Sequence, residues 1–282
     1  SKLKITANAD SVVQVQEAIV AQADDGGLTA TEYLIFHSLA ERFLQETILD
    51  ELQGGNPDAK HDFMQSQQPL FDEIYMTLSG KPWVFRSMDP PFLDIFSSYS
   101  GDRRVLDAFH ERNTMIGLRG IRFSIMFPKL FEIQVQMLGR AAQKNKGSDI
   151  YLMLPMVSFS SEVSHIRSHI ASLPEAVTCN LGCMLECPAS IFDVENLVSA
   201  GATFLSFGTN DLTQMVYRLS RDDSSELIDL YLSLGILEKN PFKSLSEDVR
   251  YLIGYVHDRL VAANMRSEIK VSLCGIQGED AD

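Results

Sequence analysis

Two patterns of apolar and polar positions alternate along the chain and predict an α/β protein. Short apolar runs that end in Gly, Pro or polar residues are typical of buried parallel strands, and apolar spacings of three and four residues indicate amphipathic helices. Strands are predicted at residues 4–10, 26–32, 83–91, 150–157, 181–186, 203–207 and 270–274.

Helical patterns follow every predicted strand except the last. We expect helices at residues 11–23, 33–52, 129–144, 160–172, 189–200, 224–234 and 246–263. Regular β–α alternation predicts a parallel (β/α)₈ barrel of the TIM type that occupies residues 1–282 as one domain. Because only seven strands are recognised, the eighth strand and helix are expected to be missing from this chain.

The segment at residues 204–214 runs from an apolar strand into Gly208 and three polar residues, Thr209, Asn210 and Asp211. In α/β proteins the carboxyl ends of the strands carry the chemistry, because their loops gather side chains over one face. Short polar side chains can also cap the helix that follows, by accepting from its free N–H groups. The sequence leaves both interpretations open.

Glu186 ends a second apolar run, at residues 181–185. An ionised carboxylate at the end of a buried strand is costly unless it is paired or bound to a cation. Because Glu186 and Asp211 follow successive strands, we expect them to face each other across about one strand spacing. Two carboxylates that leave room for water and substrate suit Mg²⁺, with Mn²⁺ as an alternative.

Three further candidates lie at or near strand ends: Arg86, Arg119 and Cys274. Guanidinium groups bind carboxylate and phosphate in a bidentate manner, although ion pairs with the protein's own carboxylates are common for arginine. A thiol at a strand end can exchange protons, or it can be an inert buried side chain.

Composition narrows the possible partners. The 282 residues include 38 acidic and 24 basic side chains, so the formal net charge is −14. This excess of negative charge argues against nucleic acid and anionic membranes as partners, since both require a basic surface. Without an apolar run of membrane-spanning length or the apolar core of a signal peptide, the chain is predicted to be cytoplasmic.

Six motifs, taken together and in order, resemble the phosphoenolpyruvate-utilising enzymes: Ile5–Asp10, Arg86–Pro91, Gly117–Arg122, Phe207–Gln214, Ser220–Asp223 and Leu273–Gly275. Asn240-Pro241-Phe242 is most similar to the pyruvate, phosphate dikinases of that family. The resemblance implies the barrel domain that binds phosphoenolpyruvate or pyruvate. Nothing in the chain resembles the family's nucleotide-binding or phosphohistidine domains.

The resemblance also assigns the chemistry. It implies a phosphotransferase that moves a phosphoryl group between phosphoenolpyruvate or pyruvate and a phosphohistidine carrier, in the same parent chain or in trans, and that forms homodimers. Glu186 and Asp211 would hold Mg²⁺, which stabilises the pyruvate enolate. Cys274 would move a proton at the methyl carbon.

Substrate binding is implied for another set of residues. By resemblance, the phosphoryl and carboxylate oxygens would be bound by Arg86, Arg119 and Arg221, with Thr209 and Asn210 beside them.

Two positions depart from the family. Ala30 stands at a position where the family has an arginine, and Ile276 stands at a position where the family has a glutamate. A non-catalytic or regulatory relative that binds phosphoenolpyruvate or pyruvate is therefore one alternative. A 2-oxo acid lyase or aldolase of related barrel type is the other.

Overall fold

The computed structural model describes residues 6–21, 25–36, 40–54, 58–97, 99, 101, 106–109, 111–145, 149–173 and 177–275. The chain divides into two compact units. Unit 1 comprises Ser1–Leu154 and Ile166–Asn180, and unit 2 comprises Pro155–His165 and Leu181–Asp282.

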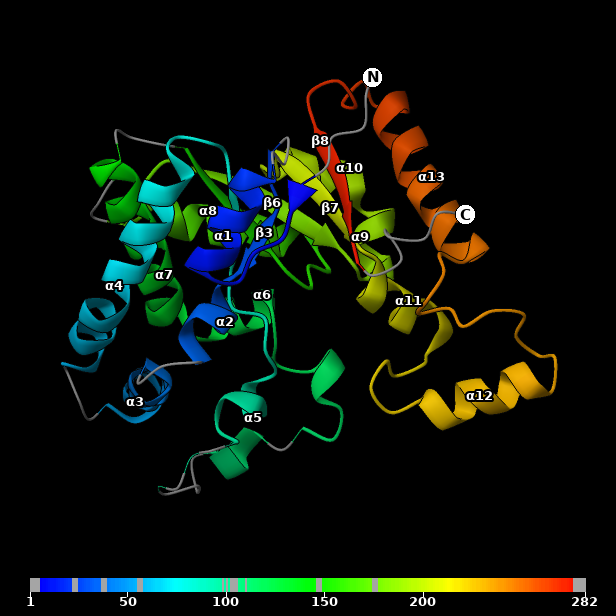
Figure 1. The fold of residues 1–282 in the computed structure, drawn as a ribbon, viewed down its shortest axis with the longest axis horizontal. Helices are drawn as coiled ribbons and strands as arrows, with labels where there is room; N and C mark the ends of the chain where they lie inside the picture. Colours follow the sequence, from blue (N-terminus) through cyan, green and yellow to red (C-terminus); the bar gives the residue numbers. More distant parts are fainter. Residues whose placement is uncertain are drawn as a thin grey trace. The chain divides into compact units, whose positions relative to one another are not determined.

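The elements of unit 1 up to Leu154 run from blue to green in Figure 1. In order, its elements are β1 (Thr6–Ala7), α1 (Val12–Val20), β2 (Asp25–Gly26), β3 (Leu28–Ala30), α2 (Thr31–Phe36), α3 (Ala40–Gln53), α4 (Ala59–Leu78), β4 (Val84–Arg86), α5 (Phe92–Ile95), η1 (Leu106–Phe109), η2 (Thr114–Ile116), α6 (Ile121–Met126), α7 (Pro128–Lys144) and β5 (Ile150–Leu154).

Two elements have residues in both units, α8 (Ser160–Ala171) and β6 (Cys179–Leu185). The remaining elements belong to unit 2: α9 (Pro188–Phe192), α10 (Val194–Ser199), β7 (Phe204–Gly208), α11 (Thr209–Tyr217), α12 (Ser225–Ser233), α13 (Glu247–Ala262) and β8 (Lys270–Cys274).

The strands of each unit run parallel and follow one another in chain order. In unit 1, β3 pairs with β4 and β4 with β5, and this register sets Ala30, Arg86 and Met153 level with one another. In unit 2, β6 pairs with β7 and β7 with β8. Parallel strands in chain order, joined by helices, confirm the α/β class and correspond to part of a TIM-type barrel.

The first predicted strand ends earlier than expected, at Ala7. β1 pairs with β2, and the chain then continues beside β3 through a mixture of backbone and side-chain bonds. Ala9 N donates to Leu28 O over 3.1 Å, but Leu28 N donates to Asn8 Oδ1 over 3.0 Å. Because a side chain replaces the backbone acceptor, the regular ladder stops there.

The helix predicted at 33–52 corresponds to α2 and α3, and residues 37–39 between them lie outside the described ranges. The helix predicted at 189–200 is divided into α9 and α10 at Asp193. Asp193 Oδ2 accepts from Ser160 N over 3.1 Å and Oδ1 accepts from Asn196 Nδ2 over 2.7 Å, so tertiary contacts hold the break.

Aromatic side chains fill the core of unit 1. Phe85 of β4 is fully buried and stacks on Tyr75 of α4, with ring centroids 5.4 Å apart. Phe92 stacks on Phe127 with centroids 5.6 Å apart. The stacking of Tyr75 on Phe85 packs α4 against β4, the strand that ends at Arg86.

Candidate functional site

The carboxyl ends of β6, β7 and β8 bring one set of predicted residues together in unit 2. Leu185 is level with Phe207, and Gly208 is level with Cys274. Glu186 follows Leu185 and therefore continues the register to the level of Gly208. Since neighbouring strands lie about 4.8 Å apart, Glu186 and Cys274 flank Gly208 on its two sides.

Glu186 is held in place by backbone groups. Its side chain is buried, and Met156 N donates to its Oε1 over 2.6 Å. Met156 has a φ of 56°, a left-handed conformation that is uncommon for a residue with a Cβ and is found at functional sites. A Cβ added at Gly208 would overlap Glu186 Oε2. The glycine thus leaves the space that the carboxylate occupies.

The first turn of α11 supplies the polar residues after β7. Thr209 Oγ1 donates to Cys274 O over 3.1 Å, so this side chain links β8 to the start of the helix, whose N-cap residue is Gly208. Asn210 Oδ1 is buried and has no hydrogen-bond partner among the described residues. Asp211 lies in the same turn, three residues after Gly208. The capping interpretation is therefore wrong for Thr209 and Asn210.

These groups fit a divalent cation. The carboxylates of Glu186 and Asp211 and the unpartnered Oδ1 of Asn210 are hard oxygen donors of the kind that Mg²⁺ prefers. Within the described ranges, no cluster of three or more His, Cys, Asp or Glu side chains could hold a metal ion by itself. A site of two carboxylates would therefore depend on water and substrate for its remaining ligands, as is usual for Mg²⁺.

Cys274 ends β8 with its thiol half-buried. Its Sγ lies 3.3 Å from Phe207 O and 3.6 Å from Ser206 Oγ. Ser206 is a contact that the sequence analysis missed, although the period-two alternation of a strand places it on the same face as Gly208. Carbonyl and hydroxyl together fix the position of the sulfur.

Unit 1 brings the two predicted arginines into one ion-pair network. Arg86 pairs with Glu32 and, over 3.3 Å, with Asp89 Oδ2. Arg119 Nη2 donates to the same Asp89 oxygen over 2.8 Å. Neither Glu32 nor Asp89 was among the site residues predicted from the sequence. Two guanidinium groups and two carboxylates thus lie together with little solvent exposure.

Burial dominates the ionisation of Glu32. Loss of hydration raises the pKa of this carboxyl, while the neighbouring Arg86 acts in the opposite direction. Its Oε2 is buried without a hydrogen-bond partner among the described residues. Ala30 lies level with Arg86 on the adjoining strand and carries no charge that could add to the network.

The side chain of Arg221 is more exposed than those of Arg86 and Arg119. Its Nε lies 3.5 Å from Asp222 Oδ1, and its backbone N donates to Gln214 Oε1 over 3.0 Å. The hydrogen bond from Arg221 N to Gln214 fixes the loop after α11 but leaves the guanidinium at the surface of unit 2. Ile276 lies outside the described residues.

Parallel strands in chain order, joined by helices, define an α/β protein with part of a TIM-type barrel, and in unit 2 their carboxyl ends carry acidic and thiol groups. The chain belongs to the family described as PEP-utilising enzyme, PEP-binding domain, which matches residues 1–282.

Similar proteins include pyruvate, phosphate dikinases from bacteria and plants. That of Rhizobium meliloti is 28% identical over 308 residues, covering 99% of this chain and 34% of the relative. That of Clostridium symbiosum is 27% identical over 308 residues, covering 99% and 35%. The chloroplastic dikinase 1 of Zea mays is 31% identical over 309 residues, covering 98% and 32%. The chain spans about one third of the length of these relatives.

In the described ranges, no helix combines the length and apolar character that crossing a membrane requires.

Proposed function

We propose that this chain binds phosphoenolpyruvate and pyruvate and takes part in phosphoryl transfer between them and a phosphohistidine carrier. The main support is the register of unit 2, which sets Glu186 and Cys274 on either side of Gly208 at the ends of adjacent strands. Membership of the PEP-binding family supports the choice of substrate. The carrier would lie in the same parent chain or act in trans.

The arginines of unit 1 would bind the anionic oxygens of the substrate. Guanidinium forks match carboxylate and phosphate groups, and their low exposure strengthens such contacts. Arg86 and Arg119 already share Asp89. A substrate anion would therefore exchange places with one of the protein's carboxylates or add to the network. Arg221 would contribute charge from the loop after α11, and Thr209 and Asn210 would contact substrate from the helix start.

Glu186 and Asp211 would hold Mg²⁺, or Mn²⁺ in its place. When bound, the cation would supply positive charge to substrate oxygens on which negative charge develops. The protein's part is to keep the two carboxylates in position, which the Met156 N–H and the missing Cβ of Gly208 do for Glu186.

Cys274 would carry a proton to or from the methyl carbon of pyruvate. Its thiol donates to Phe207 O and accepts from Ser206 Oγ, so the sulfur has a fixed direction. A positioned proton carrier beside groups that stabilise negative charge is the combination that enolate formation requires.

The test is exchange of the pyruvate methyl protons with solvent deuterium, followed by NMR. We expect Mg²⁺-dependent exchange in the parent and none in Cys274→Ala. Cys179→Ala is the matched control, because Cys179 is also a half-buried thiol but lies in unit 1. Absence of exchange in a protein shown to bind Mg²⁺ and pyruvate would contradict the catalytic proposal.

The ion-pair network of unit 1 supports a second candidate, a relative that binds these ligands without turning them over. Arg86 and Arg119 are held by Glu32 and Asp89, and Ala30 adds no third cation. Calorimetry separates the two proposals: heat with oxalate, pyruvate or phosphoenolpyruvate but no proton exchange favours binding alone. No heat with any of the three rejects both.

Homodimerisation is proposed from the family resemblance, and a cytoplasmic location is proposed from the pattern of apolar residues in the sequence. Sedimentation of the chain as a monomer would remove the first, and fractionation of the source cells tests the second.

A further inference from the structure

Helix α12 of unit 2 (Figure 1) presents a row of leucines to solvent. Leu227, Leu230 and Leu234 are 39%, 50% and 62% exposed, and spacings of three and four residues set them on one side of the helix. Ile228 is only 3% exposed, so a different side of α12 is buried. The leucine row is therefore a second apolar face, and the described residues leave it uncovered.

The chain after α12 is held in a fixed turn. Gly235 N donates to Leu232 O over 3.1 Å, and Ile236 N donates to Tyr231 O over 2.8 Å. These are the two bonds of a Schellman motif, in which Gly235 takes its left-handed φ of 68°. Ile236 follows directly and is 60% exposed. The leucine row thus lies on regular, hydrogen-bonded backbone that ends in a defined way.

An acidic row borders the leucine row. Glu226 and Asp229 are three residues apart on α12 and exposed, and neither forms an ion pair with the described residues. On a helical surface the positions 226, 229 and 233 lie next to the positions 227, 230 and 234. Residues 222–238 include five acidic side chains and no Lys, Arg or His. Negative charge beside the leucine row is therefore not balanced within this segment.

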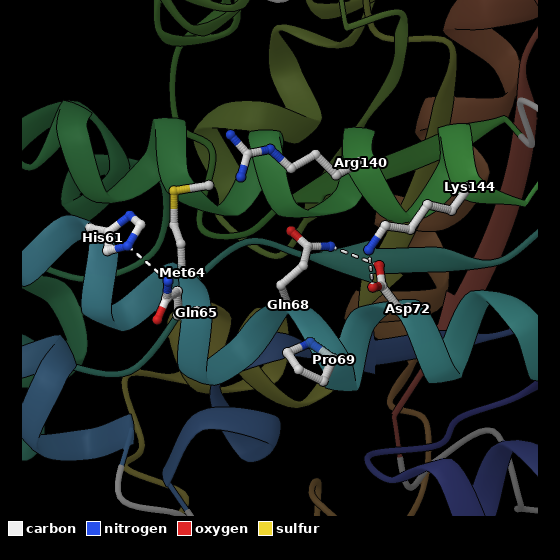
Figure 2. A pocket seen from close by; sticks show the side chains of 8 residues that line it. All are labelled: His61, Met64, Gln65, Gln68, Pro69, Asp72, Arg140 and Lys144. Carbon is white, nitrogen blue, oxygen red and sulfur yellow. Dashed lines mark hydrogen bonds and ion pairs between the residues drawn. The ribbon is translucent and has the colours of Figure 1, made fainter.

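Two surface carboxylates of unit 1 show the contrasting arrangement. In the groove between α4 and α7, Figure 2 shows Asp72 joined to Lys144 and to Gln68, whose Nε2 donates to Asp72 Oδ1 over 2.9 Å. On α3, Glu46 pairs with Arg42 over 2.8 Å. Those charges are matched inside the chain, whereas the acidic row of α12 would be matched by cations from outside.

An apolar row bordered by acids is complementary to an amphipathic helix whose apolar row is bordered by Lys or Arg. Spacings of three and four residues are those through which helices pack, and charges beside the apolar seam decide which partners pair. With nine residues, α12 is about 13 Å long, a length that matches one helix. A second copy of this chain would set acidic rows against each other, and each copy carries a net charge of −14.

We propose that the leucine row of α12 docks a basic amphipathic helix of another protein. Burial of the leucines would supply the affinity, and the acidic row would select the partner. Because a contact with one helix is small, we expect a Kd in the micromolar range. The proposal uses none of the residues assigned to catalysis or to substrate binding and does not depend on the proposed function.

Fluorescence anisotropy of a labelled synthetic helix tests this docking, with the 282-residue chain as the titrant. The probe has leucines at the a and d positions of about two heptads and lysines beside them. A second peptide has glutamate in place of each lysine. We expect saturable binding of the lysine peptide, about ten-fold or more tighter than that of the glutamate peptide. Equal affinities, or no binding of the lysine peptide, would overturn the proposal.

Substitutions in each row separate its two parts. Leu230→Gln with Leu234→Gln removes apolar surface but keeps good helix formers, and should weaken lysine-peptide binding about ten-fold or more. Val261→Gln is the matched control, because Val261 is also 50% exposed but lies on α13. Glu226→Lys with Asp229→Lys should make the glutamate peptide the tighter ligand. Unchanged binding of the lysine peptide after either pair of substitutions contradicts the proposal.

Sedimentation of the chain alone tests the alternative occupant. We expect it to be unchanged by Leu230→Gln with Leu234→Gln. A dimer that dissociates in this variant would assign the leucine row to a second copy and overturn the proposal. Exchange of pyruvate methyl protons should be the same in this variant as in the parent, so failure of peptide docking is distinguishable from failure of the proposed function.

Discussion

Glu186 and Asp211 permit a test at the level of single atoms, because a carboxamide differs from a carboxylate by little more than its charge. If both bind metal, Mg²⁺ should raise the melting temperature of the parent, since a ligand bound only by the folded state stabilises it. At a metal concentration about 100 times Kd the gain is about 2.7 kcal/mol. Glu186→Gln and Asp211→Asn should each lose this gain, as followed by thermal unfolding.

The stability of the same two variants without metal provides a control for their folding. Removing one of the two negative charges proposed to share a cation should leave the metal-free protein equally stable or more so. If Asp211 only caps α11, Asp211→Asn should keep the metal response, because asparagine caps nearly as well as aspartate. A parent without any divalent-dependent shift, alone or with oxalate, contradicts the metal assignment.

Glu32 should make stability depend on pH. Burial raises the pKa of its carboxyl above the ordinary value of 4.5, so the folded state binds this proton more tightly than the unfolded chain. The contribution of protonated Glu32 to the free energy of unfolding is fully present below the pKa of Glu32 in the unfolded chain. It is lost as pH rises through the pKa of Glu32 in the folded state. We expect the free energy of unfolding of Glu32→Gln, from urea titrations between about pH 4.5 and 7.5, to fall less steeply than that of the parent.

Equal pH slopes in the two proteins would show that Arg86 fully compensates the burial of Glu32. That outcome would also indicate that Glu32 stays ionised beside Arg86. A substrate anion would then displace this carboxylate less easily.

At the scale of elements, β6 and β7 approach each other at a point where a side chain is excluded. Gly208 has a φ of −88°, which alanine adopts freely, so the main obstacle to Gly208→Ala is overlap with the Glu186 side chain, chiefly with its Oε2. We expect this variant to lose about 1–3 kcal/mol of unfolding free energy in chemical denaturation. The loss should shrink when Glu186→Ala is combined with it, giving a coupling of about 0.5–3 kcal/mol.

Gly254 provides the matched control. It lies in α13, and a Cβ added there meets nothing within 4 Å. Gly254→Ala should therefore stabilise the helix by about 1 kcal/mol. Additive effects of Gly208→Ala and Glu186→Ala would show that the two positions do not share the space as described.

Strand ends were the most predictable part of the site. Apolar runs ending at Glu186, Gly208 and Cys274 predicted the strands β6, β7 and β8, because burial imposes a strong local pattern. The partners of Arg86 were not predictable in this way. Glu32 lies 54 residues away in sequence, and ion-pair choice at such a separation is decided by how β3 and β4 align. The left-handed backbone of Met156 was likewise not predictable, because methionine has no preference for a positive φ.

At the scale of the whole molecule, strand–helix alternation predicted the α/β class. Local patterns could not predict the partition into two units, because it depends on contacts between residues far apart in the chain. The single-domain assignment of residues 1–282 stays a prediction, and the open question is whether the units unfold together. One transition seen by both fluorescence and circular dichroism, with coincident midpoints, would support it.

The partition has a genetic consequence. The polypeptide passes between the units three times, after Leu154, His165 and Asn180, so neither unit is encoded by one uninterrupted stretch. A fragment starting at Leu181 would contain Glu186 but lack Met156, whose N–H holds it. Recombination at a single breakpoint therefore cannot exchange one whole unit for that of a relative.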